Sequence, residues 1–238
     1  MQFSLKPISP SQEPDNDFDI TKSRWTNLHD AAYEQLRTAL LDGQFAPGQN
    51  FTIRGLAAQF GTSVMPVRDA LKRLVAERAL ELRPNRSVLL PLMTRTKFLE
   101  ILEIRLKLEC MITRRAAPLA TAELVALMER DHETMCMAVQ KGDTIAYLAA
   151  NRRFHFRLYQ SAQTQVLMPL IEGLWIQIGP YLRQVFNAQS TVTDSIDHHH
   201  TDILKALRRQ DAEAAAQAIR ADLADAADTI LRADQFAS

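Results

Sequence analysis

The sequence predicts a mainly α-helical protein, with a small N-terminal domain that ends in a β-hairpin and a C-terminal all-helical bundle of about six helices. Composition and periodicity both support this prediction. Hydrophobic residues make up 47% of the 238 residues and only 7 residues are glycine, which is typical of a well-packed helical protein. Apolar residues recur every three or four positions over most of the chain, as one face of a helix requires.

The chain begins with a segment that has no helical pattern and continues with the first predicted helix. Residues 1–23 are rich in Pro, Ser and Asp and are expected to form a mobile tail. An apolar stripe at helical spacing then indicates a helix, formed by Leu28, Ala32, Leu36, Ala39 and Leu40. This helix should end at Asp42-Gly43, before a turn at Pro47-Gly48, and pack behind the elements that follow.

Residues 51–90 predict two short helices and a hairpin. Each helix has one apolar face, made of Leu56, Ala57 and Phe60 in the first and of Val67, Ala70, Leu71, Leu74 and Val75 in the second. Gly61-Thr62-Ser63 separates them, with a glycine to end one helix and hydroxyl groups to cap the next. Residues 80–82 and 87–90 flank Arg83-Pro84-Asn85-Arg86 as two strands. A helix-turn-helix followed by a hairpin is a winged helix, predicted here over residues 24–92.

The charge distribution is consistent with DNA contact by this winged helix. The whole chain has 28 Lys and Arg against 28 Asp and Glu, so its formal net charge is zero. Residues 24–95 nevertheless carry 10 basic and 6 acidic side chains. An excess of basic charge is what contact with phosphates requires, so the winged helix is expected to bind DNA.

Everything after Thr96 has helical periodicity, which predicts a second domain over residues 96–238. Six helices are expected, at about 96–117, 121–141, 143–161, 165–188, 194–209 and 211–235. The expected N-caps are Thr121, Asp143 and Asp211. Pro169 and the Gly179-Pro180 pair should bend or interrupt the fourth helix. The short connections favour antiparallel neighbours, and Pro91 to Thr96 is the predicted junction between the domains.

The cysteines and the hydropathy of the chain indicate the cellular compartment in which the protein is expected. Cys110 and Cys136 both lie in helical patterns and are expected to be reduced core residues. No apolar run approaches the roughly 18 residues of a membrane-spanning helix, and the N-terminus lacks the apolar segment of a signal peptide. A cytoplasmic protein without membrane contact is therefore expected.

Short motifs follow one another along the chain. In the N-terminal part they are Tyr33-Glu34-Gln35-Leu36, Pro47-Gly48, Leu56-Ala57, Gly61-Thr62-Ser63 and Pro66-Val67-Arg68-Asp69-Ala70-Leu71. In the bundle they are Arg105-x-x-x-Glu109, Asn151-x-x-Phe154-His155, His200-x-x-Ile203 and Asp211-Ala212. With these motifs in this order, the chain resembles GntR-family transcription regulators of the FadR-like branch. The resemblance covers roughly residues 27–235 and implies a winged helix joined to an FCD-type domain that binds an effector and dimerises.

The resemblance also implies which residues contact DNA. Arg54 and Arg68 match arginines that contact base edges and phosphates, and Arg is a bidentate donor suited to both. Thr62 and Ser63 lie where hydroxyl groups and helix N-terminal amides can hold a phosphate. Arg86, at the hairpin tip, would reach the adjacent minor groove.

The chain departs from the family pattern at the start of the second motif helix. Val64 and Met65 stand where the family most often has an Arg and a small residue. They cannot bind guanine bidentately, but they can pack on a thymine methyl group, so a different operator is expected. In the alternative interpretation, Arg68, Lys72 and Arg73 form only a solvated helix face.

Two histidines of the bundle are expected to face its interior. His155 shares a helix face with its neighbours Leu148, Asn151, Leu158 and Tyr159. In the run Asp197-His198-His199-His200, only His200 aligns with the apolar stripe of its helix, and His198 should face water. The resemblance implies a divalent metal site at Asn151, His155 and His200, with Asp222 in place of a third histidine. Zn, Ni, Mn or Fe would suit these ligands, and the alternative is a hydrogen-bonded polar cluster without metal.

Arg105 is a second polar residue on an apolar helix face. A buried arginine needs a counter-charge, which Glu109 could supply from one turn further along. In the family this Arg lies near the effector pocket, where it could meet the carboxylate of a small organic acid. Both possibilities stay open.

Three hypotheses follow for function. The first is a homodimeric transcription regulator, with repression relieved by a small carboxylate effector, that binds double-stranded DNA at a palindromic operator. The second is a metal-dependent enzyme that uses His155, His200 and Asp222 as a two-His-one-carboxylate site. The third keeps the regulator without a metal, and the effector is then bound by Arg105 and apolar walls.

Overall fold

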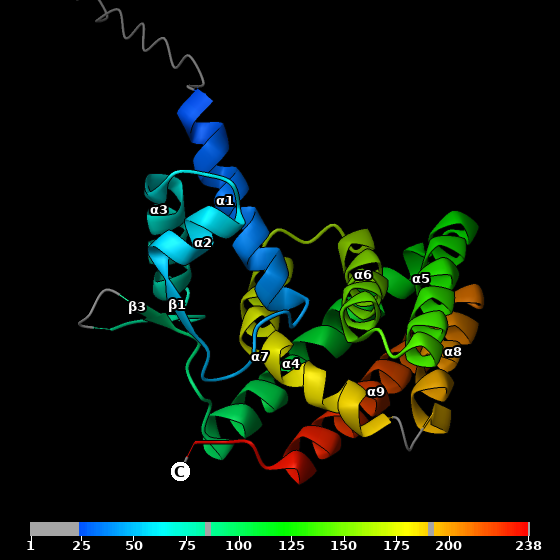
Figure 1. The fold of residues 1–238 in the computed structure, drawn as a ribbon. Helices are drawn as coiled ribbons and strands as arrows, with labels where there is room; N and C mark the ends of the chain where they lie inside the picture. The colour runs from blue at the N-terminus through cyan, green and yellow to red at the C-terminus, as the bar shows by residue number, and fades with distance from the viewer. Residues whose placement is uncertain (1–23, 84–86, 190–192, 238) are drawn as a thin grey trace, which may run out of the picture.

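The computed structural model describes residues 24–83, 87–189 and 193–237. The tail expected for residues 1–23 and the hairpin residue Arg86 lie outside this part, and the statements about them stay predictions. Figure 1 shows the N-terminal helices and a narrow sheet beside a larger helical bundle. Within the described residues, no helix is both long and apolar enough to cross a membrane.

The N-terminal part contains the predicted helices as α1 (Arg24–Leu41), α2 (Ile53–Gln59) and α3 (Val64–Ala76). Helix α1 lies against α3. Tyr33 joins the two helices, since its hydroxyl donates to Glu77 Oε1 at 2.7 Å and Arg73 lies 3.6 Å from its ring centroid. Burial and the hydrogen bond to Glu77 raise the pKa of Tyr33 to about 12. Large buried side chains close the core between the helices, namely Leu36, Leu40, Val67, Leu71 and Leu74.

The turn between α2 and α3 follows the prediction in part. Gly61 adopts a left-handed φ of 61°, which glycine accepts without strain. Ser63 occupies the N-cap position of α3, but its hydroxyl makes no capping hydrogen bond. Thr52 does cap α2, because its hydroxyl accepts from the Gly55 N–H at 3.0 Å.

Three short strands form an antiparallel sheet in the order β1-β3-β2. β2 (Glu81–Leu82) and β3 (Ser87–Leu89) are the predicted hairpin. The sequence does not predict β1 (Asn50–Thr52), because three residues between a turn and a helix show no strand periodicity. β1 pairs with β3, with Phe51 opposite Val88, and so holds the start of α2 against the hairpin.

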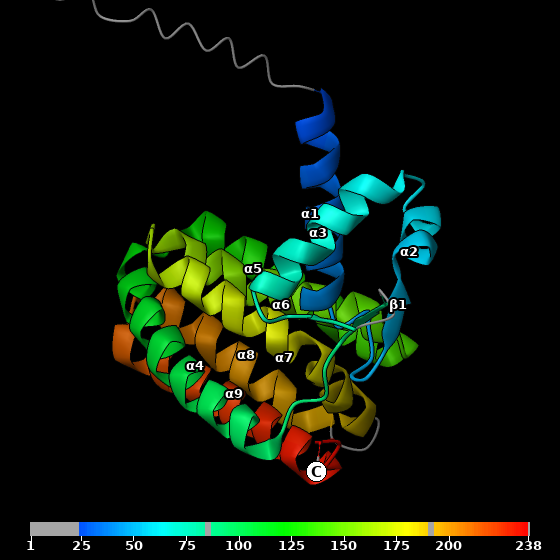
Figure 2. The ribbon, with the colours of Figure 1, turned by 90° about the vertical axis from the view of Figure 1, so that its left-hand side faces the viewer.

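The described part of the bundle contains the six predicted α-helices. They are α4 (Arg95–Ala116), α5 (Ala122–Lys141), α6 (Thr144–Ser161), α7 (Leu167–Gln189), α8 (Thr193–Arg208) and α9 (Ala212–Ala233). The expected N-caps are confirmed, since Thr121, Asp143 and Asp211 each accept a hydrogen bond from the backbone three residues further on. Helix α4 packs on α9 and α7. Figure 2 shows α4 crossing the front of the bundle, with α8 and α9 behind it.

Of the bend or interruption expected at Pro169 and Gly179-Pro180, the interruption is wrong, because α7 continues from Leu167 to Gln189. Pro169 lies in the first turn, where a backbone N–H has no acceptor within the helix. Pro180 lies inside the helix. Gly179 lets α1 approach closely, since a Cβ atom there would lie 2.4 Å from the carbonyl oxygen of Leu40.

Two ion pairs accompany this contact between α1 and the bundle. Arg37 on α1 pairs with Glu172 on α7 at 2.5 Å. Asp42, just after α1, accepts a hydrogen bond from Arg152 Nε on α6 at 2.6 Å. Helix α1 therefore packs behind the helix-turn-helix, as expected, and also joins it directly to α6 and α7.

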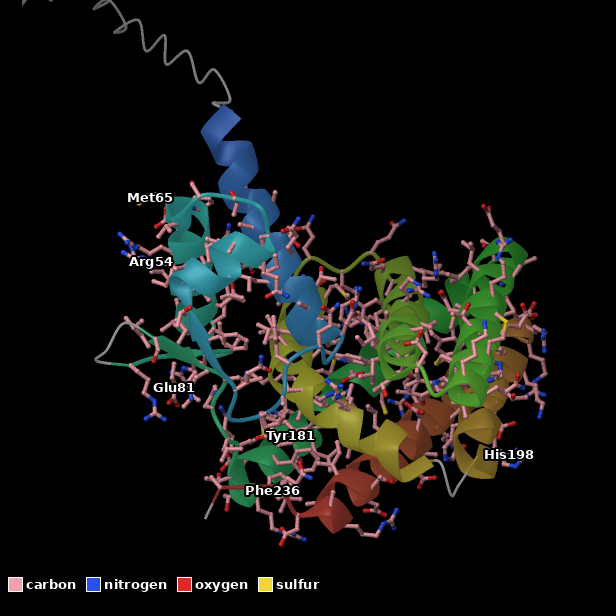
Figure 3. All side chains as sticks on the ribbon, viewed as in Figure 1. Arg54, Met65, Glu81, Tyr181, His198 and Phe236 are labelled. Carbon is pink, nitrogen blue, oxygen red and sulfur yellow. The ribbon has the colours of Figure 1, made fainter. Side chains whose placement is uncertain are left out.

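The segment between the wing and α4 is also held to the bundle. The Met93 N–H donates to the Tyr181 hydroxyl at 2.6 Å. Phe236 stacks on Tyr181 with a centroid separation of 6.0 Å, and both residues lie below the wing in Figure 3. The Ala237 N–H donates to the Met93 carbonyl at 3.0 Å, so residues 236–237 cover this segment.

Neither Cys110 nor Cys136 forms a disulfide bond in the part of the chain that the structure describes. Cys110 is buried, as expected, and its Sγ lies 3.4 Å from the carbonyl oxygen of Ala216. Cys136 is only half-buried, so the expectation that it is a core residue is wrong.

Candidate functional site

The four predicted metal ligands meet inside the bundle. Asn151 and His155 lie one turn apart on α6, His200 lies on α8 and Asp222 lies on α9. His155 Nε2 is 3.4 Å from Asp222 Oδ2, and His200 Nε2 is 3.8 Å from Asp222 Oδ1. His200 Nε2 is 3.2 Å from Asn151 Oδ1. One ligand atom from each of His155, His200 and Asp222 lies within 4.8 Å of the others.

The cluster is largely shielded from water. His155 and His200 are each 1% exposed, and the Asp222 side chain is 13% exposed. Phe154 packs edge-on against the His200 ring, with centroids 4.8 Å apart. As the helical stripe predicts, His200 faces the core while His198 is exposed. Helical spacing was therefore sufficient to identify which histidine of the run faces the cluster.

A second polar group lies beside this cluster and centres on Glu109. The Glu109 side chain is fully buried and accepts from Arg105 Nε at 2.6 Å, the Tyr159 hydroxyl at 2.7 Å and Trp175 Nε1 at 3.0 Å. The structure thus contains the internal ion pair between Arg105 and Glu109. Sequence patterns do not identify Tyr159 or Trp175 as members of this group. The one sequence signal for this group is the position of Tyr159, one helical turn after His155.

The Tyr159 hydroxyl connects the two groups. Burial and Glu109 raise the pKa of Tyr159 well above its ordinary value, so it stays protonated and donates its single proton to Glu109. The same oxygen lies 3.3 Å from His155 Nδ1. One ring nitrogen of His155 thus lies beside Tyr159, and the other, Nε2, lies 3.4 Å from Asp222 Oδ2.

Burial shifts the pKa values of His155 and Asp222 in opposite directions. It lowers the pKa of His155 well below its ordinary value, with the positive charges of His200 and Arg105 as smaller causes. It raises the pKa of Asp222, against the opposing effect of His200, His199 and Arg105. His155 is therefore neutral at pH 7, so it can offer an imidazole nitrogen to a cation beside the Asp222 carboxylate. Two imidazole nitrogens and one carboxylate fit Zn, Ni, Mn or Fe.

The predicted DNA-contact residues lie around the start of α3. Arg54 on α2, the N-cap residue Ser63 and Arg68 on α3 are exposed, and Thr62 is half-buried. Figure 3 shows Arg54 and Met65 at the outer edge of the N-terminal part, away from the bundle. Together these side chains leave the start of α3 free to enter a DNA groove.

The two residues that depart from the family pattern differ in their surroundings. Val64 packs partly against the core, whereas Met65 is 53% exposed. The Met65 Sδ atom lies 3.9 Å from Arg68 Nη1, one turn further along α3. Arg73 does not belong to a purely solvated face, because it pairs with Asp30 at 3.1 Å and stacks on Tyr33. Of the two apolar residues, Met65 is thus the more exposed to solvent.

Comparison with known proteins covers both parts of the chain. The model of the gntR family of bacterial regulatory proteins matches residues 28–90, and the FCD domain model matches residues 100–225. The HTH-type transcriptional regulator McbR of Escherichia coli K12 is 32% identical over 180 residues, which cover 75% of this chain and 81% of McbR. The HTH-type transcriptional repressor RspR of the same strain is 24% identical over 198 residues, or 83% of this chain and 86% of RspR.

Solved structures agree with these matches. The E. coli McbR/YncC structure is similar with a TM-score of 0.82 at 27% identity, and covers 87% of this chain and 98% of its own. A GntR structure from Rhodococcus sp. RHA1 has a TM-score of 0.71 at 23% identity over 87% of this chain and 99% of its own, and shares the fold. These relatives are regulators, and they give no support to the alternative of a metal-dependent enzyme.

The motifs, the winged helix and the helical bundle thus agree with the matched families. The gntR match covers the winged helix, and the FCD match covers more than half of the chain. The chain therefore belongs to the gntR family of bacterial regulatory proteins, and it is a DNA-binding transcription regulator with a C-terminal FCD domain.

Proposed function

We propose that this regulator is a homodimeric repressor whose affinity for a palindromic operator is lowered by a small organic acid bound in the bundle. The observation that carries the proposal is the buried convergence of acceptor atoms from His155, Asp222 and Asn151. Imidazole nitrogens and carboxylate oxygens gathered in this way are ligands that a divalent ion prefers. Asn151, His155, His200 and Asp222 would hold a divalent ion there. When bound, the ion supplies positive charge and open coordination positions that a carboxylate can occupy.

Arg105 is the second feature that supports an acidic effector. Its Nε and Nη2 atoms face Glu109, at 2.6 Å and 3.5 Å. Within the residues that the structure describes, Nη1 makes no hydrogen bond. A guanidinium with a remaining donor, beside a cation site, suits the carboxylate of a small acid. Arg105 would then bind the acid while Glu109 holds the Arg105 side chain in place.

DNA would be held by the residues around the start of α3. Arg54, Arg68 and the hairpin residue Arg86 would contact bases and phosphates, Thr62 and Ser63 a phosphate, and Val64 and Met65 a thymine methyl group. One winged helix would occupy each half of a palindromic site. A ligand that prefers one relative placement of the two winged helices would change operator affinity by that difference.

Arg68→Ala is expected to weaken operator binding about 10- to 100-fold, because a bidentate contact of Arg is worth about 1–3 kcal/mol. The measurement is fluorescence anisotropy at fixed salt, with DNA from upstream of the gene itself. Arg209→Ala is the matched control, since Arg209 is exposed just after the end of α8, far from the winged helix, and should leave the affinity unchanged.

Two results would count against this part of the proposal. Unchanged affinity in Arg68→Ala would remove Arg68 from the interface. Absence of salt-dependent binding by the wild-type protein would contradict operator recognition at that site altogether.

Protein purified without chelators is expected to carry about one divalent ion per chain, and the double variant His155→Ala, His200→Ala should lose it, because two of the ligand atoms are then missing. The measurement is elemental analysis of the purified protein. His198→Ala is the matched control, since it removes an exposed histidine of the same helix and should keep the metal. Full metal content in the double variant would refute this ligand set. A wild-type protein free of Zn, Ni, Mn and Fe would favour the regulator without metal.

A further inference from the structure

Residues 234–237, which follow α9, return to the connection between the winged helix and the bundle. We call them the return segment. Asp234 ends α9 with a left-handed φ of 47°, so the chain changes direction there. In Figure 1 the chain then runs from α9 to the start of α4. Ala237 forms a parallel β-bridge with Thr94, the N-cap residue of α4. The last described residues therefore lie against the point where the bundle begins.

The return segment contacts Met93 and its surroundings with both backbone and side chain. The Ala237 N–H donates to the Met93 carbonyl at 3.0 Å, and the Met93 N–H donates to the Tyr181 hydroxyl at 2.6 Å. The Phe236 ring stacks on Tyr181, at an interplanar angle of 12°, and lies 5.3 Å from the Phe98 ring between centroids. Both backbone polar groups of Met93 are thus bound, one by α7 and one by the return segment.

Met93 belongs to a very short linker. Leu90 is still held by the N-terminal part, since its N–H donates to the Gln49 carbonyl at 2.9 Å. Thr94 already caps α4. Residues 91–93 alone connect the two, and Met93 is buried, with 4% of its surface exposed. Whatever holds Met93 therefore restricts the direction in which the winged helix leaves the bundle.

The N-terminal part contacts α7 from two sides. The end of α1 lies against Gly179, where a Cβ atom would be 2.4 Å from the Leu40 carbonyl oxygen. Met93 lies against Tyr181. Residues two positions apart are about 200° apart around a helix axis, so these contacts are on different sides of α7. One contact alone would leave a hinge, whereas the two together define the orientation of the winged helix.

We propose that the return segment positions the winged helix for operator binding, because it closes the second of these contacts. The inference rests on the homodimer and the palindromic operator of the proposed function. After one winged helix binds, the other meets its half-site at an effective concentration that depends on how narrowly it is placed. A winged helix that binds one half-site alone gains nothing from this fixed placement.

Deletion of residues 235–238 tests the positioning role, since it removes Phe236 and Ala237 but none of the predicted DNA-contact residues. It should weaken binding to a palindromic duplex about tenfold and leave binding to a single half-site within about twofold of wild type. DNase protection on DNA from upstream of the gene locates the site. The probes are this duplex and the same duplex with one half scrambled. Fluorescence anisotropy at fixed salt gives both affinities.

Point variants and hydrogen exchange give a second readout. Phe236→Ala should also weaken binding to the palindrome selectively, and the Met93 amide should exchange at least about tenfold faster, because its cover is loosened. Phe236→Tyr keeps the ring and should behave as wild type. Leu231→Ala is the matched control, since Leu231 is a half-buried apolar residue of α9 before the return segment, and it should change neither quantity. Circular dichroism checks the fold of each variant.

The outcomes separate the inference from the proposed function. An equal loss on the palindrome and on the half-site overturns the positioning role, because a lost DNA contact or a damaged fold acts on both probes. Unchanged or tighter binding to the palindrome, together with faster exchange at Met93, overturns it as well. A wild-type protein that binds the palindrome no more tightly than the half-site contradicts the homodimeric recognition of the proposed function, and the inference with it.

Discussion

Glu109→Ala is expected to lower the free energy of unfolding by about 3–5 kcal/mol, because it leaves the Arg105 charge buried without a partner. Arg105 is only 4% exposed, and the Glu109 side chain accepts hydrogen bonds from three side chains. The Tyr159 hydroxyl and the Trp175 indole would lose their acceptor in the same variant. Urea unfolding followed by circular dichroism measures the change.

Glu213→Ala is the control for this experiment. It also breaks an Arg–Glu pair, with Arg114 at 2.7 Å, but the two side chains are 44% and 60% exposed. An exposed pair contributes at most about 1 kcal/mol, so the loss should be small. If the two variants were equally mild, the view that a buried charge network organises the core would be wrong.

Gly179→Ala is expected to destabilise the protein by about 1–3 kcal/mol through overpacking at the contact between α1 and α7. The added Cβ would lie 2.4 Å from the Leu40 carbonyl oxygen and 3.0 Å from that of Leu41. Both neighbours are backbone atoms at the end of α1, so the helices themselves must separate. Thermal unfolding gives the stability change, and operator binding of the same variant shows whether the altered contact reaches DNA.

Gly173→Ala supplies a control of opposite sign on the same helix. A Cβ atom there meets no heavy atom within 4 Å. Alanine is favoured over glycine inside a helix by about 0.5–1 kcal/mol, so this variant should be slightly more stable than wild type. If Gly173→Ala destabilised the protein as much as Gly179→Ala does, the close contact of Gly179 with α1 would not explain the loss of stability.

Features that depend on local sequence were predictable. The helices, their caps at Thr121, Asp143 and Asp211, and the inward direction of His155 and His200 follow from spacing and from the chemistry of helix ends. Each of these properties is decided within a few residues of the chain. The helix-turn-helix and the hairpin are predictable for the same reason, since their turns and apolar faces are local patterns.

Features that depend on distant partners were not predictable. Trp175 joins Glu109 across 66 residues, and no local pattern distinguishes it from an ordinary core aromatic residue. Gly179 has the sequence pattern of a helix breaker, although its role is to let α1 approach α7. Strand β1 exists only because β3 offers it hydrogen-bond partners. In each case the tertiary contact, and not the propensity of the segment, determines the structure.

Asn151 and Arg152 are consecutive residues of α6, and their side chains contact different parts of the molecule. Asn151 faces His200 in the buried cluster, while Arg152 holds Asp42 at the end of α1. Adjacent residues of one α-helix move together when the helix rotates. Any rotation of α6 that moves Asn151 therefore moves Arg152 as well, and with it the anchor of the helix on which α3 rests. The cluster and α3 are thus connected through α6, the Arg152–Asp42 ion pair and α1.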